Sequence, residues 1–178
     1  MPALARWFVV GLVAVASLAL GFYFRQQAQT PVQSPVPPAA AAGLMGVALP
    51  DQQGREQRLD QWRGRVLVVN FWATWCAPCR EEMPEFIKAQ NEFGGKGLQF
   101  VGIAVDSGDK IRQFAAEIGV NYPILVGGFG AMELSRTLGN TIMALPFTVI
   151  VNRNGEIAHT QLGVLKREKL DSIVRQLL

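Results

Sequence analysis

Cysteine and histidine, the residue types that most often bind zinc, are scarce in this sequence, which has two cysteines and one histidine among its 178 residues. A structural zinc site needs four ligands, usually drawn from these residue types. Cys76 and Cys79 stand together, whereas His159 lies far along the chain, where we expect an edge or surface position. We therefore expect no metal site, and the cysteine pair must have another role.

Acidic residues are absent from residues 1–43, where Arg6 and Arg25 are the only charged side chains. Without these two positive charges the net charge falls from +3 to +1, so the sequence pI of about 9.1 owes much to this segment. A nearly neutral remainder does not favour binding to nucleic acid. We expect no nucleic-acid partner.

Charge is also lacking in the 18 residues of Trp7–Phe24, a run that two arginines bracket. As a helix this run would span about 27 Å, close to the hydrocarbon thickness of a bilayer. Ala14–Ala16 could be the cleavage site of a signal peptide, but cleavage there would leave Leu18–Phe24 exposed at the new terminus. We therefore expect residues 1–25 to be an uncleaved membrane anchor with one transmembrane helix.

Residues 26–43 contain four prolines and an alanine run, and they carry no charge. Nothing in this composition favours a packed core, so we expect a linker. As a coil this linker would reach roughly 25 Å, which keeps the remaining domain, residues 44–178, close to the membrane surface.

The cysteine pair lies where a strand is expected to turn into a helix. Residues 66–72 are almost continuously apolar and predict a buried strand, and a helix is expected from about Cys76, because Pro78 is tolerated in a first helical turn. Free amides and the helix dipole would favour a Cys76 thiolate. Cys79 would lie on the same face, one turn deeper and within disulfide reach. An activated thiolate and a second thiol within disulfide reach are the minimum that thiol–disulfide exchange requires.

A purely structural disulfide is the alternative for this pair. The loop between the two cysteines is so short that chain entropy suggests only about 2 kcal/mol of stabilisation. A disulfide that closes a longer loop stabilises the fold more, so we favour redox catalysis as the role of this pair.

The string from Asn70 to Pro84, Asn-Phe-Trp-Ala-Thr-Trp-Cys-Ala-Pro-Cys-Arg-Glu-Glu-Met-Pro, resembles the active-site segment of the thioredoxin superfamily. Within it, the string is similar to the membrane-anchored TlpA, ResA and CcmG-like branch, and the likeness covers roughly residues 46–178. The resemblance implies a thiol–disulfide oxidoreductase whose redox-active group is a Cys76–Cys79 disulfide, with no other cofactor.

The rest of the chain predicts an α/β domain, a thioredoxin-like mixed sheet flanked by helices. We expect strands at residues 47–49, 66–72, 98–105, 122–126, 147–151 and 157–163, and helices at 76–93, 110–118, 131–138 and 166–178. The last two strands should form a hairpin through the turn residues 152–155, where Asn-Gly suits positive φ, and apolar residues at helical spacing make the last helix amphipathic. The resemblance implies that the turn-containing segment before the strand at residues 66–72 is an N-terminal hairpin extension. It also implies that the middle of the domain carries a helical insertion. Gly102, within a buried strand, suggests a close approach of another group.

Pro146 begins one of the expected strands, where an ordinary proline would cost a ladder hydrogen bond. The matching proline of the thioredoxin superfamily is cis and faces the cysteine pair. Such a bond would turn the backbone of Leu145 outward, so that a substrate segment could pair with it as an added strand. With the helix start, this predicts substrate contacts at Trp75, Ala77, Pro78, Leu145 and Pro146. A simple strand-start proline remains the alternative.

Cys79 needs a proton acceptor to act as a resolving thiol. Thioredoxin keeps a buried aspartate where this chain has Asn70, so that route is absent. Relatives with asparagine there can use an acid on the loop after the second strand, which makes Asp106 and Asp109 candidates, although we favour capping of the next helix as the role of each. We expect Glu81 and Glu82, just beyond the pair, to face solvent.

Ala77-Pro78, between the cysteines, lacks the histidine of strongly oxidising relatives, so we expect a reductant. The resemblance implies exported cysteine-containing proteins as substrates, such as apocytochrome c or copper-assembly proteins, and a membrane dithiol donor of the DsbD/CcdA kind. It also implies a single-pass location in the bacterial inner membrane, with the catalytic domain on the periplasmic side.

Two other functions stay open at the level of sequence. A copper-binding or copper-delivery module could use Cys76, Cys79 and His159 as ligands. A peroxidase of the peroxiredoxin kind would share the fold, but that class usually places a lone cysteine in a threonine-containing loop. The Trp75-containing CxxC segment stands there instead.

Overall fold

The computed structural model describes residues 36–178. The expected anchor, residues 1–25, lies outside these described residues, as does the first part of the expected linker. Between residues 36 and 178, no helix combines the length and the apolar content that crossing a bilayer demands.

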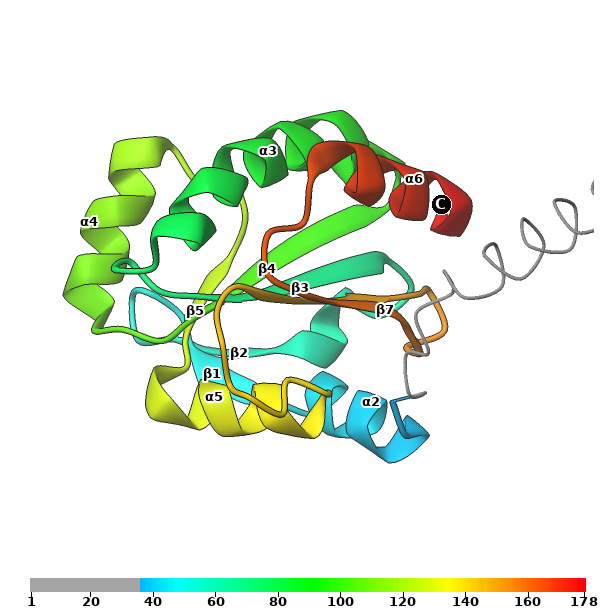
Figure 1. Cartoon of the computed structure of the whole chain (residues 1–178), viewed down its shortest axis with the longest axis horizontal. Helices are drawn as coiled ribbons and strands as arrows, with labels where there is room; N and C mark the ends of the chain where they lie inside the picture. The colour runs from blue at the N-terminus through cyan, green and yellow to red at the C-terminus, as the bar shows by residue number, and fades with distance from the viewer. Residues whose placement is uncertain (1–35) are drawn as a thin grey trace, which may run out of the picture. The chain divides into compact units, whose positions relative to one another are not determined.

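The domain is built on a five-stranded mixed sheet with the strand order β5-β4-β3-β6-β7 (Figure 1). The strands are β3 (Val66–Trp72), β4 (Leu98–Ala104), β5 (Ile124–Val126), β6 (Phe147–Val151) and β7 (Ile157–Leu162). β3, β4 and β5 run parallel, whereas β6 and β7 are antiparallel to their neighbours. Every residue of β3 and β4 is buried, which explains their continuous apolar runs, because a parallel sheet is covered on both faces.

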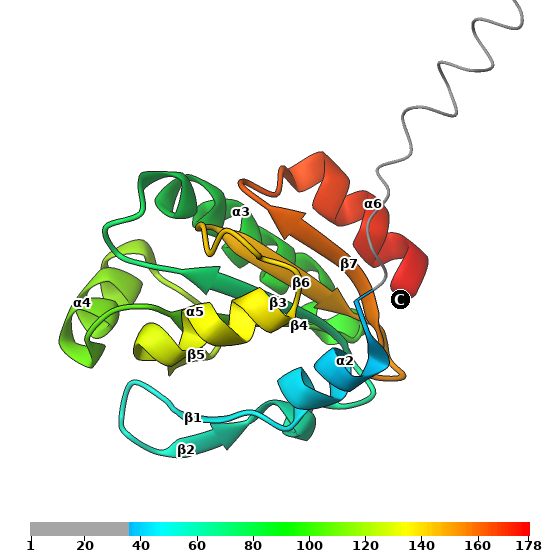
Figure 2. The ribbon, with the colours of Figure 1, turned by 60° about the horizontal axis from the view of Figure 1, so that its bottom comes forward.

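Helices cover both faces of this sheet, as the sequence pattern predicted. They are α3 (Ala77–Phe93), α4 (Gly108–Ile118), α5 (Gly128–Thr137) and α6 (Arg167–Leu177), with a short 3₁₀ helix, η2 (Gly94–Lys96), after α3. α3 and α6 lie on one face, and α5 lies on the other (Figure 1, Figure 2). β3 therefore runs through the middle of the sheet, between β4 and β6, and α3 follows it along the chain and lies over one face of the sheet (Figure 1).

The expected N-terminal hairpin is present as β1 (Ala48–Pro50) and β2 (Glu56–Arg58), followed by the 3₁₀ helix η1 (Leu59–Trp62). Its turn is organised by Asp51, whose carboxylate accepts hydrogen bonds from the backbone amides of Gln53 and Arg55 at 2.9 and 3.0 Å. Asp51 also forms a backbone bridge with Leu125 of β5. The hairpin is thereby fastened to the edge of the main sheet.

The linker prediction is wrong for its last residues. Pro38–Met45 form the helix α2, and Ala41, Leu44 and Met45 within it are buried. The alanine run is a strong helix former, and proline is compatible with a first helical turn. The two apolar residues that end the helix then give it a face to bury against the domain, which composition alone did not indicate.

Gly102 is a point of close approach, as its position in a buried strand suggested. A Cβ atom at Gly102 would lie 2.8 Å from Nε1 of Trp72, a distance that real Cβ atoms essentially never show. Glycine thus provides the space that the Trp72 indole ring occupies above β4.

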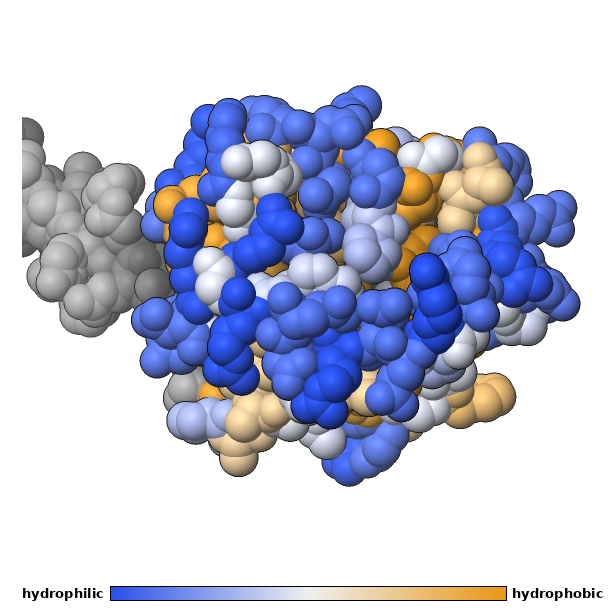
Figure 3. Space-filling view, turned by 180° about the vertical axis from the view of Figure 1, so that it is seen from behind, coloured by the Kyte–Doolittle hydropathy of each residue, from blue (hydrophilic) through white to orange (hydrophobic). Residues whose placement is uncertain are grey.

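The second predicted hairpin, β6–β7, is also present. The side chain of Asn152 caps its turn by accepting hydrogen bonds from the amides of Asn154 and Glu156, both at 3.0 Å. Gly155 adopts the positive φ of 86° that the turn requires. The face of the domain turned away from the viewer in Figure 1 is mainly hydrophilic, and apolar groups show there only in small patches (Figure 3).

Candidate active site

Cys76 and Cys79 are joined by a disulfide, with an S–S distance of 2.05 Å and a Cα–Cα distance of 5.3 Å. Cys76 is the N-cap residue of α3, and its Sγ accepts a hydrogen bond from the Cys79 amide at 3.3 Å. Amides at a helix N-terminus stabilise a thiolate, so this position favours ionisation of Cys76 once the disulfide is reduced. Cys76 is 5% exposed and Cys79 is completely buried, so an attacking sulfur can reach Cys76 first.

The loop before α3 is held in place by bonds to its surroundings. The Cys76 amide donates to the carbonyl of Ala73 at 3.2 Å, and the Thr74 hydroxyl donates to the carboxylate of Asp106. Asp106 follows β4, so this contact joins the loops at the ends of two neighbouring parallel strands. The sulfur at the helix tip is therefore positioned by the sheet beneath it.

An open groove of about 530 Å³ lies beside Cys76. Ten residues line it: Trp75, Cys76, Ala77, Pro78, Val105, Phe129, Met132, Met143, Ala144 and Leu145. The structure thus brings together most of the residues expected to contact substrate. Sequence reasoning did not predict the wall that α5 and the following loop contribute to this groove.

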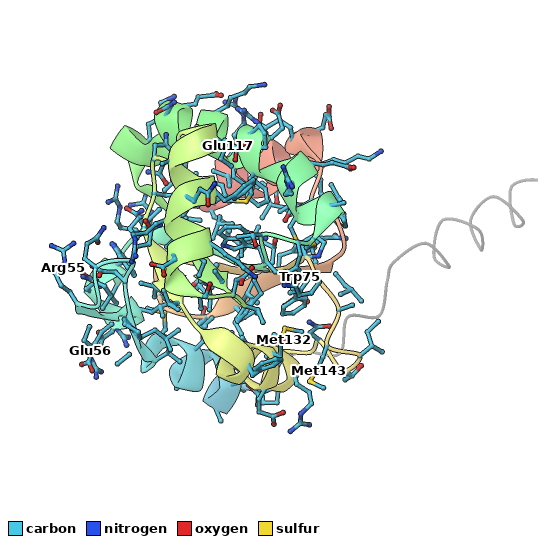
Figure 4. The ribbon with its side chains drawn as sticks, turned by 90° about the vertical axis from the view of Figure 1, so that its left-hand side faces the viewer. Arg55, Glu56, Trp75, Glu117, Met132 and Met143 are labelled. Atoms are coloured by element: carbon cyan, nitrogen blue, oxygen red, sulfur yellow. A yellow bond between two sulfur atoms is a disulfide. The ribbon has the colours of Figure 1, made fainter. Side chains whose placement is uncertain are left out.

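Large apolar side chains stand exposed around this groove. Trp75 is 68% exposed, Phe129 91%, Ile142 70% and Met143 46%. Trp75 lies above Met132 and Met143 at the same end of the domain (Figure 4). Exposed apolar residues scattered singly need no explanation, but a contiguous group beside a reactive atom marks a binding surface.

The peptide bond between Leu145 and Pro146 is cis, as the resemblance implied. The preceding loop is held by Asn140, whose side chain accepts from the Ala144 amide at 3.1 Å and donates to the Ala144 carbonyl at 2.8 Å. The Pro146 carbonyl accepts from the Gly163 amide at 2.9 Å. The backbone N–H and C=O of Leu145 have no hydrogen-bond partner within residues 36–178, so both are free to pair with a substrate segment.

Neither aspartate considered as a proton acceptor is well placed for that task. Burial tends to raise the pKa of Asp106, but hydrogen bonds from Thr74 and Ser107, together with the charge of Lys110, hold that pKa below its ordinary value. A carboxylate with a lowered pKa is a weak base. The Asp109 side chain is 88% exposed and pairs with Arg112 on the surface of α4.

The expectation that Glu82 faces solvent is wrong, although Glu81 is exposed as expected. Glu82 is 2% exposed, and its two carboxylate oxygens accept hydrogen bonds from Asn70 Nδ2 at 2.8 Å and from the Leu165 amide at 2.9 Å. Burial raises the pKa of Glu82 to about 7, against the lowering effect of these two hydrogen bonds. A general base works best when its pKa lies near the working pH.

Glu82 stands three residues after Cys79 on α3, and residues at this spacing lie on one face of a helix, one above the other. The sequence did contain a signal for this burial. The buried positions of α3 recur every three or four residues, at Cys79, Glu82, Met83, Phe86, Ala89 and Phe93. Glu82 falls within this apolar stripe, whereas Glu81 does not.

The groups considered for metal binding do not assemble. Within the described part of the chain, no cluster of three His, Cys, Asp or Glu side chains could hold an ion. His159 lies in the edge strand β7 opposite Ile150 of β6, the kind of position expected for it, and it is not among the residues that line the groove.

Comparison with known proteins agrees with this site. The sequence matches the Redoxin family over residues 31–178. It is 26% identical to the thiol-disulfide oxidoreductase ResA of Halalkalibacterium halodurans over 172 residues, which covers 94% of this chain and 92% of the relative. It is 31% identical to the thioredoxin-like protein YneN of Bacillus subtilis over 122 residues, which covers 66% of this chain and 68% of the relative.

A solved structure of a putative thiol:disulfide interchange protein DsbE from Chlorobium tepidum superposes with a TM-score of 0.65 and 25% identity. The superposition covers 74% of this chain and 92% of that structure. The family match spans most of the sequence, and it includes the CxxC pair at the tip of α3. The chain therefore belongs to the Redoxin family, and it is a thioredoxin-like thiol–disulfide oxidoreductase.

Proposed function

We propose that this protein is a membrane-tethered reductase of disulfides in exported proteins. The observation that carries the proposal is the arrangement of the two sulfurs: Cys76 borders an apolar groove, and Cys79, three residues further along the chain, is completely buried. A reachable first sulfur and a protected second sulfur suit an exchange reaction with a covalent intermediate. The redox-active group is the Cys76–Cys79 pair, and the reaction needs no further cofactor.

The first step begins with the reduced pair. The Cys76 thiolate attacks one sulfur of a substrate disulfide, which forms a Cys76–substrate disulfide and releases the other substrate sulfur as a thiolate. Substrate would lie in the groove against Trp75 and Pro78. An extended segment would pair with the free backbone groups of Leu145, next to Pro146.

The second step resolves this mixed disulfide. Cys79 loses its proton to the Glu82 carboxylate and attacks Cys76, so that the Cys76–Cys79 disulfide forms and the second substrate thiolate leaves. Two electrons pass from the pair to the substrate, which leaves as a dithiol. We assign Glu82 this role ahead of Asp106 and Asp109, because its pKa lies near neutrality and its helical spacing places it next to Cys79.

The sequence and the resemblance support the proposed location and redox partners. The uncharged run of residues 7–24 would anchor the chain in the bacterial inner membrane with the catalytic domain on the periplasmic side. Exported cysteine-containing proteins, such as apocytochrome c or copper-assembly proteins, would be the substrates. A membrane dithiol protein of the DsbD/CcdA kind would return two electrons and two protons to the pair.

A trapping experiment tests the proposal. In membranes of the native host, Cys79→Ala should accumulate mixed disulfides between Cys76 and its substrates, because the resolving sulfur is missing. Cys76→Ala is the matched control, since the remaining Cys79 is completely buried and should trap nothing. Adducts would be separated on non-reducing gels and identified by mass spectrometry.

Absence of any covalent adduct with Cys79→Ala would refute the resolving role. The direction of the reaction is tested by the reduction potential of the wild-type pair. We expect a value near that of glutathione or below, whereas a value above about −150 mV would place the protein among the oxidants.

A further inference from the structure

The loop between α5 and β6 carries one wall of the groove beside Cys76. Met143, Ala144 and Leu145 of this loop line the groove, and Met132 of α5 lines it too (Figure 4). Between α5 and β6 the chain forms turns and a bend but no helix or strand. Hydrogen bonds outside helices and sheets must therefore hold this wall in shape.

Met143 has an unusual backbone conformation within this loop. Its φ is 49°, and among residues 36–178 every other residue with a positive φ is a glycine. A bulky residue adopts this conformation rarely, and it persists only where the surroundings enforce it. Two hydrogen bonds to Asn140 enclose Met143: the Met143 amide donates to the Asn140 carbonyl at 2.9 Å, and the Ala144 amide donates to Asn140 Oδ1 at 3.1 Å. Asn140 therefore fixes the backbone on both sides of Met143.

The side chain of Asn140 acts as an additional peptide group. Asn140 is 1% exposed, its Oδ1 accepts from the Ala144 amide, and its Nδ2 donates to the Ala144 carbonyl at 2.8 Å. Both backbone groups of Ala144 are thus paired with one carboxamide. A carboxylate of the same shape has no donor for the carbonyl. Asparagine therefore suits this position, directly before the free backbone groups of Leu145.

The same side chain ties the loop to α5. Asn140 Nδ2 also donates to the hydroxyl of Ser135 at 3.1 Å, and that hydroxyl donates to the Met132 carbonyl at 2.7 Å. The Asn140 amide donates to the Ser135 carbonyl at 3.1 Å. Met132 and Ala144, at the two ends of this chain of hydrogen bonds, both line the groove. The chain of bonds therefore joins the α5 wall of the groove to the loop wall.

We propose that Asn140 is a positioning residue for protein substrates, which holds the Ala144–Leu145 backbone in place for a substrate segment and keeps the two walls of the groove together. This inference rests on the proposed function and deepens it. A loop that is ordered before substrate arrives loses little conformational entropy on binding. Release of the loop would therefore weaken binding of an extended segment and leave the sulfur chemistry at Cys76 unchanged.

Asn140→Asp tests the inference, because it keeps the shape of the side chain and replaces Nδ2 with an oxygen that cannot donate when ionised. The reduced protein, freed of reductant, would be mixed with an excess of insulin or of dithiobis-nitrobenzoate in a stopped-flow instrument. Tryptophan fluorescence would report oxidation of the cysteine pair. We expect the half-saturating concentration of insulin to rise about tenfold with an unchanged maximal rate, because the loop must now be ordered on binding. Reaction with the small disulfide, which needs no strand partner, should stay within about twofold of the wild-type rate.

Asn152→Asp is the matched control. The Asn152 side chain also accepts from two backbone amides and donates to Glu156, but it does so in the β6–β7 turn, and Asn152 does not line the groove. Neither reaction should change in this variant. An unchanged half-saturating concentration of insulin in Asn140→Asp would overturn the inference. Equal slowing of both reactions would also overturn it, because that is the result that a merely structural role of Asn140 predicts.

A measurement on the wild-type protein covers the case in which Asn140→Asp does not fold. Amide hydrogen exchange, followed by NMR, should be about 10²-fold slower for Ala144, which donates to Asn140, than for Leu145, whose amide has no partner within residues 36–178. Equal exchange rates would show that Asn140 does not hold the loop. This readout does not depend on activity, so it fails separately from the trapping experiment.

Discussion

Glu82→Gln removes a charge from the interior while keeping the shape of the side chain. The pKa of Glu82 is raised from 4.5 to about 7, chiefly by burial, and the residue is only 2% exposed. Each pKa unit corresponds to about 1.4 kcal/mol, so ionisation of the buried group should cost about 3 kcal/mol of folding free energy. Glutamine retains one carbonyl oxygen, which can still accept the hydrogen bond of the Leu165 amide, but its amide nitrogen cannot accept the hydrogen bond of Asn70 Nδ2, so that bond is lost at every pH.

The sign of the pH dependence follows from the raised pKa. The stability associated with the protonated carboxyl is fully present below about pH 4.5 and is lost as the pH rises through about 7. The difference in free energy of unfolding between Glu82→Gln and wild type should therefore shift in favour of the variant by up to about 3 kcal/mol between pH 5 and pH 9.

Urea denaturation of the oxidised proteins, followed by tryptophan fluorescence at pH values between 5 and 9, measures this difference. Glu81→Gln is the matched control, because Glu81 is exposed and its substitution should leave the wild-type pH dependence in place. If the difference in free energy of unfolding between wild type and Glu82→Gln stays constant from pH 5 to pH 9, then the pKa of the Glu82 carboxyl is not raised by folding. Glu82 would then not be a proton acceptor with a pKa near neutrality.

The remaining predictions concern the groove, the packing of the sheet and the resolving step. Gly102→Ala should destabilise the fold by about 1–3 kcal/mol in urea denaturation, because the added Cβ would collide with Trp72, whereas Gly95→Ala has open space and should change little. Phe129→Ser should raise KM for protein disulfides about tenfold and leave the reduction of a small aromatic disulfide unchanged. The control Leu162→Ser, at an exposed apolar residue outside the groove, should not raise KM for protein disulfides, and equal effects of Phe129→Ser on both substrates would argue against a docking role. Glu82→Gln should slow release of substrate from the mixed disulfide about 10²-fold in stopped-flow assays, and an unchanged rate would exclude it as the base.

Local pattern was sufficient for most of the elements of the fold. Val66–Trp72 and Leu98–Ala104 are continuous apolar strands, and the structure buries every residue in both. The turn residues Asn152–Gly155 predicted the second hairpin, and the stripe of apolar residues predicted α6. These features depend on neighbouring residues, so a single sequence contains the information that decides them.

The N-terminal boundary of the domain depended on packing. The composition of residues 26–43 predicted a linker, yet Pro38–Met45 fold into α2 with Leu44 completely buried. An alanine-rich segment has helical propensity in any context, but isolated short helices are marginal in water. Burial of its last residues against the domain supplies the remaining stabilisation, and that contact is not visible in the segment itself.

The sequence by itself determined the chemistry of this protein: two cysteines three residues apart where a strand turns into a helix. Only the tertiary structure decided what surrounds them. Glu82 is buried because Asn70 and Leu165, 12 and 83 residues away, supply its hydrogen bonds. The groove exists because α5 carries Phe129 and Met132 to the side of Cys76. Periodicity records which face a residue occupies, but the partners that make burial of a carboxylate or exposure of an aromatic ring favourable come from distant segments.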